Sequence, residues 1–206
     1  MPFVNLAKKE INFKIVYYGP PLCGKTTNLE YLHKILPANA KGQMTMLSTR
    51  QDRTLYFDFL PLKSDAIKGF TSRFQLYTVP GQPIYNHTRK IVLTGVDGIV
   101  FVADSQWAMM EENVESFKNL QENLASYNRS LDNIPYVLQF NKRDLPDIAQ
   151  CEYLDFLFNY KRPTRALWFE AVAITGKGVV ETLNMICKMV IADFIETNKT
   201  VQKTVP

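Results

Sequence analysis

The residues best suited to chemistry lie near the N-terminus, where Gly-Pro-Pro-Leu-Cys-Gly-Lys-Thr runs from Gly19 to Thr26. They follow the apolar run 15–18, so a strand leads directly into the pattern G-x-x-x-x-G-K-T. In this context glycine lets the backbone curl, successive amides converge on phosphate oxygens, and the following helix presents its positive end. Lys25 should then reach the β- and γ-phosphates, and the Thr26 hydroxyl should coordinate Mg²⁺. The pattern predicts a nucleotide-binding loop, the alternative being a glycine-containing turn that matches by chance.

Two prolines make this loop unusual. Pro20 and Pro21 have no amide hydrogen, so neither can donate to a phosphate. The phosphate cradle is therefore expected to use the amides from Leu22 onward. Nucleotide contacts are assigned to Pro21, Leu22, Cys23, Gly24, Lys25, Thr26 and Thr27.

A second group of polar residues indicates which nucleotide is bound. Asn141, Lys142, Arg143 and Asp144 follow the apolar run 136–140 and fit the pattern N-K-x-D. A carboxylate at Asp144 can accept hydrogen bonds from the ring N1 and the exocyclic amine of guanine, a donor pair that adenine lacks. The pattern therefore predicts guanine binding by Asn141, Lys142 and Asp144, and it disfavours an ATP-dependent kinase of the phosphate-loop class.

The composition is that of a soluble globular protein. Of 206 residues, 46% are hydrophobic and 21% are charged, and no stretch approaches the roughly 18 apolar residues of a membrane span. The net charge of +4 is mild, so no nucleic-acid partner is expected. Neither a secretory signal nor a prenylation cysteine is evident, which predicts a cytoplasmic protein without an integral membrane segment. The length fits one domain, 1–206, with a core at about 10–197 and a short tail at 198–206.

The cysteines and histidines are isolated from one another. Cys23, Cys151 and Cys187 have no paired spacing, so neither a disulfide framework nor a zinc motif is expected. Cys23 is either a redox-active group or, as we favour, a small side chain packed against the loop. His33 and His87 have no recognisable acidic or nucleophilic neighbour, so neither is assigned a metal-binding or catalytic role.

Apolar runs alternate with helical stretches along the chain, which predicts an α/β architecture. Strands are expected at 12–18, 55–60, 73–79, 98–103, 136–140 and 167–173, and helices at 25–35, 107–127, 152–160 and 179–197, with a shorter helix after Gly81. Only a polar loop with Pro61 and Gly69 separates the second and third strands, so these two should form an antiparallel hairpin while the others run parallel. Ser105 is the expected N-cap of the long middle helix.

Together these motifs make the chain resemble the Ras-like small GTPases, and further segments make it similar to one bacterial branch, the MglA family. Residues 79–82, Val-Pro-Gly-Gln, stand where other small GTPases have D-x-x-G-Q, with Thr78 in the aspartate position, a trait of MglA proteins. Residues 16–20, 53–61 and 95–98 are also similar to the family, and the resemblance spans about 10–195. It implies a three-layer phosphate-loop GTPase fold, with a mixed, mainly parallel sheet of about six strands and helices on both faces.

The resemblance implies roles for four residues near the phosphates. Thr54 matches the switch threonine that completes magnesium coordination when the γ-phosphate is present, and Gly81 matches the glycine whose amide contacts that phosphate. Gln82 matches the glutamine that positions the attacking water. Arg53 matches the arginine that MglA proteins supply from their own chain, a device worth roughly 10³ to 10⁵ in rate in GTPases generally. From composition alone, Arg53 would be a solvated residue in a polar run.

The chain departs from related patterns at several positions. Thr78 removes a carboxylate from the outer shell of the magnesium, and Asp58 is the candidate to replace it through water, an exposed strand carboxylate being the alternative. Val172 and Ala173 stand where small GTPases carry S-A-K, so the backbone amide of Ala173 is expected to donate to guanine O6. Pro21 occupies a position that is commonly glycine in MglA proteins, and its ring would crowd the site of hydrolysis.

The resemblance implies a Mg²⁺-dependent switch that binds GTP and GDP and hydrolyses GTP slowly when alone. It also implies a Roadblock-type activating partner, MglB, that positions Arg53 and Gln82. The implied output is cell polarity and surface motility through GTP-dependent effector binding, by a protein that is monomeric alone and suited to recruitment to a cell pole. The alternative is a GTP-loaded interaction module in which Pro21 makes hydrolysis negligible.

Overall fold

Strands and helices alternate along the chain in the computed structural model, which describes residues 2–48, 53–59, 67, 69–160 and 162–204. The strands are β1 (Phe3–Asn5), β2 (Glu10–Tyr18), β3 (Thr45–Ser48), β4 (Arg53–Phe59), β5 (Thr71–Thr78), β6 (Gly98–Asp104), β7 (Tyr136–Asn141) and β8 (Trp168–Glu170). The helices are α1 (Lys25–Ile35), α2 (Asn86–Leu93), α3 (Met110–Ala125), α4 (Cys151–Asn159) and α5 (Val179–Thr204), with short 3-10 turns η1 (Ala38–Ala40), η2 (Pro83–Tyr85) and η3 (Trp107–Met109).

The described strands form one eight-stranded sheet in the order β3-β4-β5-β2-β6-β7-β8, with β1 paired to β2. Strands β5, β2, β6, β7 and β8 run parallel, whereas β1, β3 and β4 pair antiparallel with their neighbours. All six expected strands are present, and the expected antiparallel pairing of β4 with β5 is confirmed. Strands β1 and β3 are additional to the prediction.

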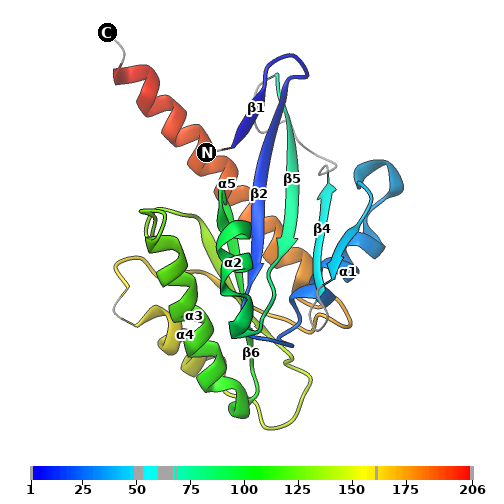
Figure 1. Cartoon of the computed structure of the whole chain (residues 1–206), viewed down its shortest axis with the longest axis vertical. Helices are drawn as coiled ribbons and strands as arrows, with labels where there is room; N and C mark the ends of the chain where they lie inside the picture. The colour runs from blue at the N-terminus through cyan, green and yellow to red at the C-terminus, as the bar shows by residue number, and fades with distance from the viewer. Residues whose placement is uncertain (1, 49–52, 60–66, 68, 161, 205–206) are drawn as a thin grey trace.

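Helices cover both faces of the sheet, α1 and α5 on one face and α2, α3 and α4 on the other (Figure 1). Alternation along β2 produces the two cores, because successive strand side chains point to opposite faces. Phe13, Ile15 and Tyr17 pack toward α1 and α5, whereas Val16 and Tyr18 pack toward the other three helices. The expected three-layer α/β fold of a phosphate-loop GTPase is thereby confirmed.

Three local expectations were wrong. Helix α5 continues to Thr204, so most of the expected tail at 198–206 is helical, residues 205–206 lying outside the described part. Strand β8 ends at Glu170 and not at residue 173, because the chain leaves the sheet there to form a loop beside β7. Ser105 is not the N-cap of the middle helix, since η3 intervenes and α3 begins at Met110. The last residue of the expected strand 55–60 is also outside the described residues.

Within the described part of the chain, none of the helices combines the length and apolarity needed to cross a bilayer.

Candidate functional site

The phosphate loop begins at the carboxyl end of β2, which lies between β5 and β6 in the sheet. Gly19 and Gly24 have positive φ angles of 145° and 103°. A Cβ atom on Gly19 would lie 2.1 Å from the carbonyl oxygen of Val102, and one on Gly24 would lie 2.2 Å from Nδ2 of Asn141. Both positions require glycine, because a side chain would strain the backbone and collide with a neighbour.

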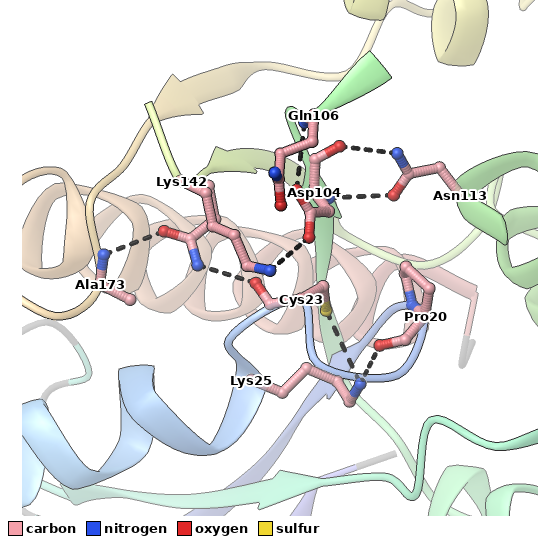
Figure 2. A network of polar contacts seen from close by, with 9 residues as sticks. Pro20, Cys23, Lys25, Asp104, Gln106, Asn113, Lys142 and Ala173 are labelled. Atoms are coloured by element: carbon pink, nitrogen blue, oxygen red, sulfur yellow. Dashed lines mark hydrogen bonds and ion pairs between the residues drawn. The ribbon is translucent and has the colours of Figure 1, made fainter. Parts of the chain in front are cut away.

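The ammonium group of Lys25 lies inside this loop. Nζ donates to the carbonyl oxygens of Gly19 at 2.9 Å and Pro20 at 2.5 Å, and it lies 3.7 Å from Sγ of Cys23. Figure 2 shows the contacts with Pro20 and Cys23. Lys25 is only 6% exposed. The loop thus fixes a buried positive charge where the sequence pattern places phosphate, although Pro20 has no amide to offer.

The Cys23 thiol is a packing group of the loop. It is fully buried, and this burial raises the pKa of the Cys23 thiol. A raised pKa keeps the sulfur protonated and unreactive. The side chain therefore has the packing role favoured from the sequence.

Asn141 joins three segments that are distant in the sequence. Its Nδ2 donates to the carbonyl oxygen of Cys23 at 2.8 Å, and its Oδ1 accepts from the amide of Ala173 at 2.9 Å. Because Asn141 is buried, both halves of its amide need partners, and the two loops supply them. Asn141 therefore fixes the phosphate loop relative to the loops after β7 and β8.

This arrangement bears on the role expected for Ala173. Its backbone N–H is expected to donate to guanine O6, and in this structure the same N–H donates to Oδ1 of Asn141, a partner that the nucleotide would have to replace. The neighbouring amide of Val172 is also taken, because it donates to the carbonyl oxygen of Lys177 at 3.0 Å. Both residues shape the loop beside the base position.

The predicted guanine residues surround a pocket of about 230 Å³. The pocket adjoins the phosphate loop and the start of α1, as a nucleotide that spans both motifs requires. Leu145 and Ile174 also line it and were not identified from the sequence. The full lining is Leu22, Gly24, Thr27, Asn141, Lys142, Asp144, Leu145, Ala173 and Ile174.

Lys142 is held beside this pocket by a buried carboxylate. Its Nζ lies 2.5 Å from Oδ2 of Asp104, a residue with 0% exposure at the end of β6. The other carboxylate oxygen accepts from the Gln106 amide at 3.1 Å. The Asn113 side chain bonds both the amide and the carbonyl of Asp104, at 3.0 and 2.8 Å (Figure 2). Asp104 is thus anchored on both main chain and side chain, and it directs the Lys142 side chain.

A second group of predicted residues lies where β5 ends. The backbone of Gly81 packs against the phosphate loop so closely that a Cβ atom there would lie 2.3 Å from Cα of Pro21. The Gly81 carbonyl accepts from Nη1 of the buried Arg89 at 3.1 Å. The structure therefore brings Gly81 and Pro21 into contact, with Gln82 next along the chain.

Strand β4 carries the remaining predicted residues, for which the structure describes the backbone. Arg53 pairs with Ser48 and Thr54 with Leu47, at the start of β4. Since β4 is antiparallel to β5, this start lies at the edge of the sheet where β5 ends. Asp58 pairs with Gln75, which pairs with Lys14 of β2. Asp58 is therefore in register with Lys14, which lies four residues before the end of β2. Four strand residues span about 13 Å, so Asp58 is about that far from the phosphate loop along the strand.

The protein groups near the loop suit a magnesium ion that is held mainly by a nucleotide. Thr26, in the first turn of α1, offers a hydroxyl, whereas Thr78 is fully buried and neutral. Among the residues described by the structure, no group of three or more His, Cys, Asp or Glu side chains could hold a metal. Mg²⁺ at phosphate sites takes most of its ligands from phosphate and water, and the Thr26 hydroxyl is a hard oxygen donor of the kind it accepts.

Comparison with known proteins agrees with the site geometry. No family model matches the chain. The chain is 52% identical over 193 residues to the Mutual gliding-motility protein MglA of Myxococcus xanthus (strain DK1622), an alignment that covers 94% of this chain and 97% of that protein. It is also 26% identical over 191 residues to GTP-binding protein 10 of Homo sapiens, covering 82% of this chain and 48% of the human protein. From the first of these relationships, we conclude that the chain belongs to the MglA family of small GTPases.

Proposed function

We propose that the protein is a guanine-nucleotide switch that binds GTP and GDP with Mg²⁺ and hydrolyses GTP to GDP and phosphate. The connection made by Asn141 between the phosphate loop and the guanine pocket carries this proposal. Because Asn141 joins the two parts, they form one continuous site for a ligand with a guanine at one end and phosphates at the other. The MglA relative supports the same conclusion.

Binding is assigned to both ends of this site. Asp144 accepts from the guanine edge, and the Lys142 side chain forms part of the pocket wall. Lys25 exchanges its carbonyl partners for the β- and γ-phosphates. Thr26 and Thr54 are the proposed magnesium ligands, and Mg²⁺, when bound, offsets the negative charge of the phosphates. The register of β4 does not favour Asp58 as an outer ligand.

Hydrolysis is assigned to Gln82, which orients the attacking water, and to Arg53, which offsets charge on the transferring phosphoryl group. The contact between Gly81 and Pro21 supports a link between Gln82 and the phosphate loop. Arg53 begins a strand at the same edge of the sheet. We infer that a Roadblock-type partner, MglB, completes their alignment.

The name of the Myxococcus relative, a gliding-motility protein, supports a role in motility. We propose that the GTP-bound protein recruits effectors that set cell polarity and surface motility, as a cytoplasmic monomer that is drawn to a cell pole.

One observation favours a second candidate function. Because the main chain of Gly81 already lies against the main chain of Pro21, the proline ring adds bulk close to the residue that precedes Gln82. In this second candidate, the protein captures effectors when loaded with GTP, and hydrolysis is negligible.

Single-turnover phosphate release distinguishes the two functions. The protein is loaded with GTP and Mg²⁺, and release is followed with and without an MglB-type partner. We expect slow release alone and faster release with the partner, both reduced in Gln82→Ala. If the wild-type protein releases phosphate no faster than Gln82→Ala in either condition, hydrolysis is negligible and the second candidate function is correct.

The matched variant for this experiment is Pro21→Gly, which removes the ring and leaves the guanine pocket intact. If crowding by Pro21 limits hydrolysis, this variant releases phosphate faster than the wild type at unchanged GTP affinity. An unchanged rate would show that the ring has no part in setting turnover.

A further inference from the structure

A second pocket, of about 320 Å³, lies between α2 and α3 and reaches the phosphate loop. We call it the α2–α3 pocket. The two helices lie side by side on one face of the sheet (Figure 1). Pro21 and Gly81 line one end of the pocket, Arg89 contributes from α2, and polar residues of α3 line the rest. None of the predicted guanine residues lines it.

Three residues that line this pocket have a buried polar atom that makes no hydrogen bond within the protein. Ser116 is 7% exposed, and its Oγ makes no hydrogen bond. Arg89 is 3% exposed, and its Nε is also unpaired, although Nη1 and Nη2 donate to the carbonyl oxygens of Gly81 and Pro83. Oε2 of Glu112 is a third such atom. Since unsatisfied buried groups are costly and uncommon, these three atoms indicate a ligand that pairs with them.

The charges of α3 define the sign of that ligand. Glu112, Glu115 and Ser116 are three and four residues apart, so they share one face of the helix. Lys118 is paired with Glu122 at 3.9 Å, and no ion pair found among the described residues involves Glu112 or Glu115. The pocket lining therefore carries three carboxylates, of Glu112, Glu115 and Glu122, against two cations, Arg89 and Lys118. This net negative charge favours a positively charged ligand over a phosphate or carboxylate.

The unpaired Nε of Arg89 adds a second requirement. It is a donor and needs an acceptor oxygen, which a bare cation cannot provide. A guanidinium group has a planar set of donors that can bond a carboxylate and a hydroxyl together. An arginine residue in a peptide combines this group with a main-chain carbonyl.

We propose that the α2–α3 pocket binds an arginine side chain of a partner protein. The guanidinium bonds Glu112 and Ser116, Glu115 adds attraction, and the carbonyl oxygen of the same peptide accepts from Nε of Arg89. Charge complementarity selects this occupant over an acidic or apolar segment.

The position of Arg89 connects this pocket to the nucleotide. Arg89 holds the Gly81 carbonyl, and Gly81 touches Pro21 of the phosphate loop. A change in Gly81 between GDP and GTP forms would alter the pocket, so affinity for the partner arginine should differ between the two forms. The difference in affinity between the two forms rests on the proposed GTP–GDP switch. Binding of the partner arginine to the GDP form does not depend on that switch.

The test uses a small probe, Nα-acetyl-arginine N-methylamide, added to the ¹⁵N-labelled, GDP-loaded protein. Two further probes isolate the chemistry: the citrulline counterpart has the same shape without charge, and N-butylguanidinium has the guanidinium without a carbonyl. We expect saturable NMR shifts at Gly81 and Ser116 with the arginine probe, at least about tenfold weaker binding of the citrulline probe, and weaker binding of N-butylguanidinium.

Glu112→Gln is the test variant, because it removes the charge and preserves the shape of the side chain. Glu111→Gln is the matched control, since Glu111 is exposed on the same helix and does not line the pocket. We expect about tenfold weaker probe binding in Glu112→Gln and no change in Glu111→Gln, with GDP affinity and melting temperature unchanged in both.

Equal binding of the arginine and citrulline probes, equal effects of the two variants, or an absence of shifts at Gly81 and Ser116 would overturn the proposal. Equal binding of N-butylguanidinium would overturn the role of Arg89. If the probe binds equally to the GDP form and to a GTP-analogue form, the pocket stands and its coupling to the nucleotide is wrong.

Discussion

Asp104 shows how one buried carboxylate can set the shape of a binding pocket. The Lys142 stem lines the guanine pocket, while its ammonium is held 2.5 Å from Asp104. A lysine can use its aliphatic stem for packing when its charged end has a partner. We infer that Asp104 acts through Lys142 as a positioning residue for guanine.

We expect Asp104→Asn to weaken GDP binding by about tenfold, because loss of the anion releases a partly buried ammonium. The asparagine oxygen can still accept from the Gln106 amide. Measurement of GDP dissociation with a fluorescent nucleotide provides the affinity. Asp132→Asn is the control, since Asp132 forms an exposed ion pair with Arg162 and lines neither nucleotide motif.

A double-mutant cycle separates positioning from general destabilisation. Lys142→Met keeps the stem and removes the charge. If Asp104 acts through Lys142, then Asp104→Asn has little further effect on GDP affinity in the Lys142→Met background. Additive losses would contradict this mechanism.

Individual residues differed in how far the sequence could predict them. The phosphate loop and the N-K-x-D residues were predictable because their spacing within a strand-loop unit defines their neighbours. Asp104 was not, because an aspartate after an apolar strand carries no sign of the lysine it meets 38 positions later. The bond between the Ala173 amide and Asn141 was missed for a similar reason, since only the folded chain brings the two residues together.

At the scale of elements, a buried polar network joins β2 to α2 through α3. The Tyr18 hydroxyl donates to Oδ1 of Asn119 at 2.6 Å and accepts from Nδ2 of Asn123 at 3.0 Å. Both asparagines also donate to Oδ1 of Asn86, at 3.1 and 2.9 Å. Burial raises the pKa of Tyr18 to about 12, so the phenol remains a neutral donor at physiological pH. The strand that leads into the phosphate loop is thereby fixed to the start of α2.

We expect Asn123→Leu to destabilise the protein by about 2–3 kcal/mol, because it leaves buried polar partners unsatisfied. For a domain of this size, that corresponds to a fall of about 4–12 °C in melting temperature. Thermal unfolding of the GDP-loaded protein measures the change. Gln121→Leu is the control on the exposed side of α3, and equal melting temperatures for the two variants would show that the network adds no stability.

The elements also show the limits of sequence patterns. The central strands were predictable because long apolar runs are typical of strands buried on both faces. Strands β1 and β3 were missed because three- and four-residue strands at the margins of a sheet carry no clear period. Helix α5 continues beyond its predicted end because no proline or glycine stops it before Pro206.

At the scale of the whole molecule, the two helical layers meet the nucleotide site at a single edge of the sheet. Asn141 connects the start of α1 to the loops after β7 and β8, so the site draws on elements from both ends of the chain. A ligand that bridges these loops should therefore stabilise the entire fold and not one layer alone. Binding and global unfolding are linked in such a case.

We expect the melting temperature to rise with the concentration of free GDP, and to keep rising at concentrations above the dissociation constant. Each tenfold increase in GDP adds about 1.4 kcal/mol when the unfolded chain does not bind it. For a domain of this size, the step is about 3–6 °C. Differential scanning measurements at fixed protein and Mg²⁺ concentrations test this, with ADP as the matched control because adenine lacks the donors that Asp144 recognises. A rise with ADP equal to that with GDP would contradict guanine selection by the pocket. A GDP response that levels off above the dissociation constant would show that the nucleotide stabilises a local segment and that the rest of the fold unfolds independently of it.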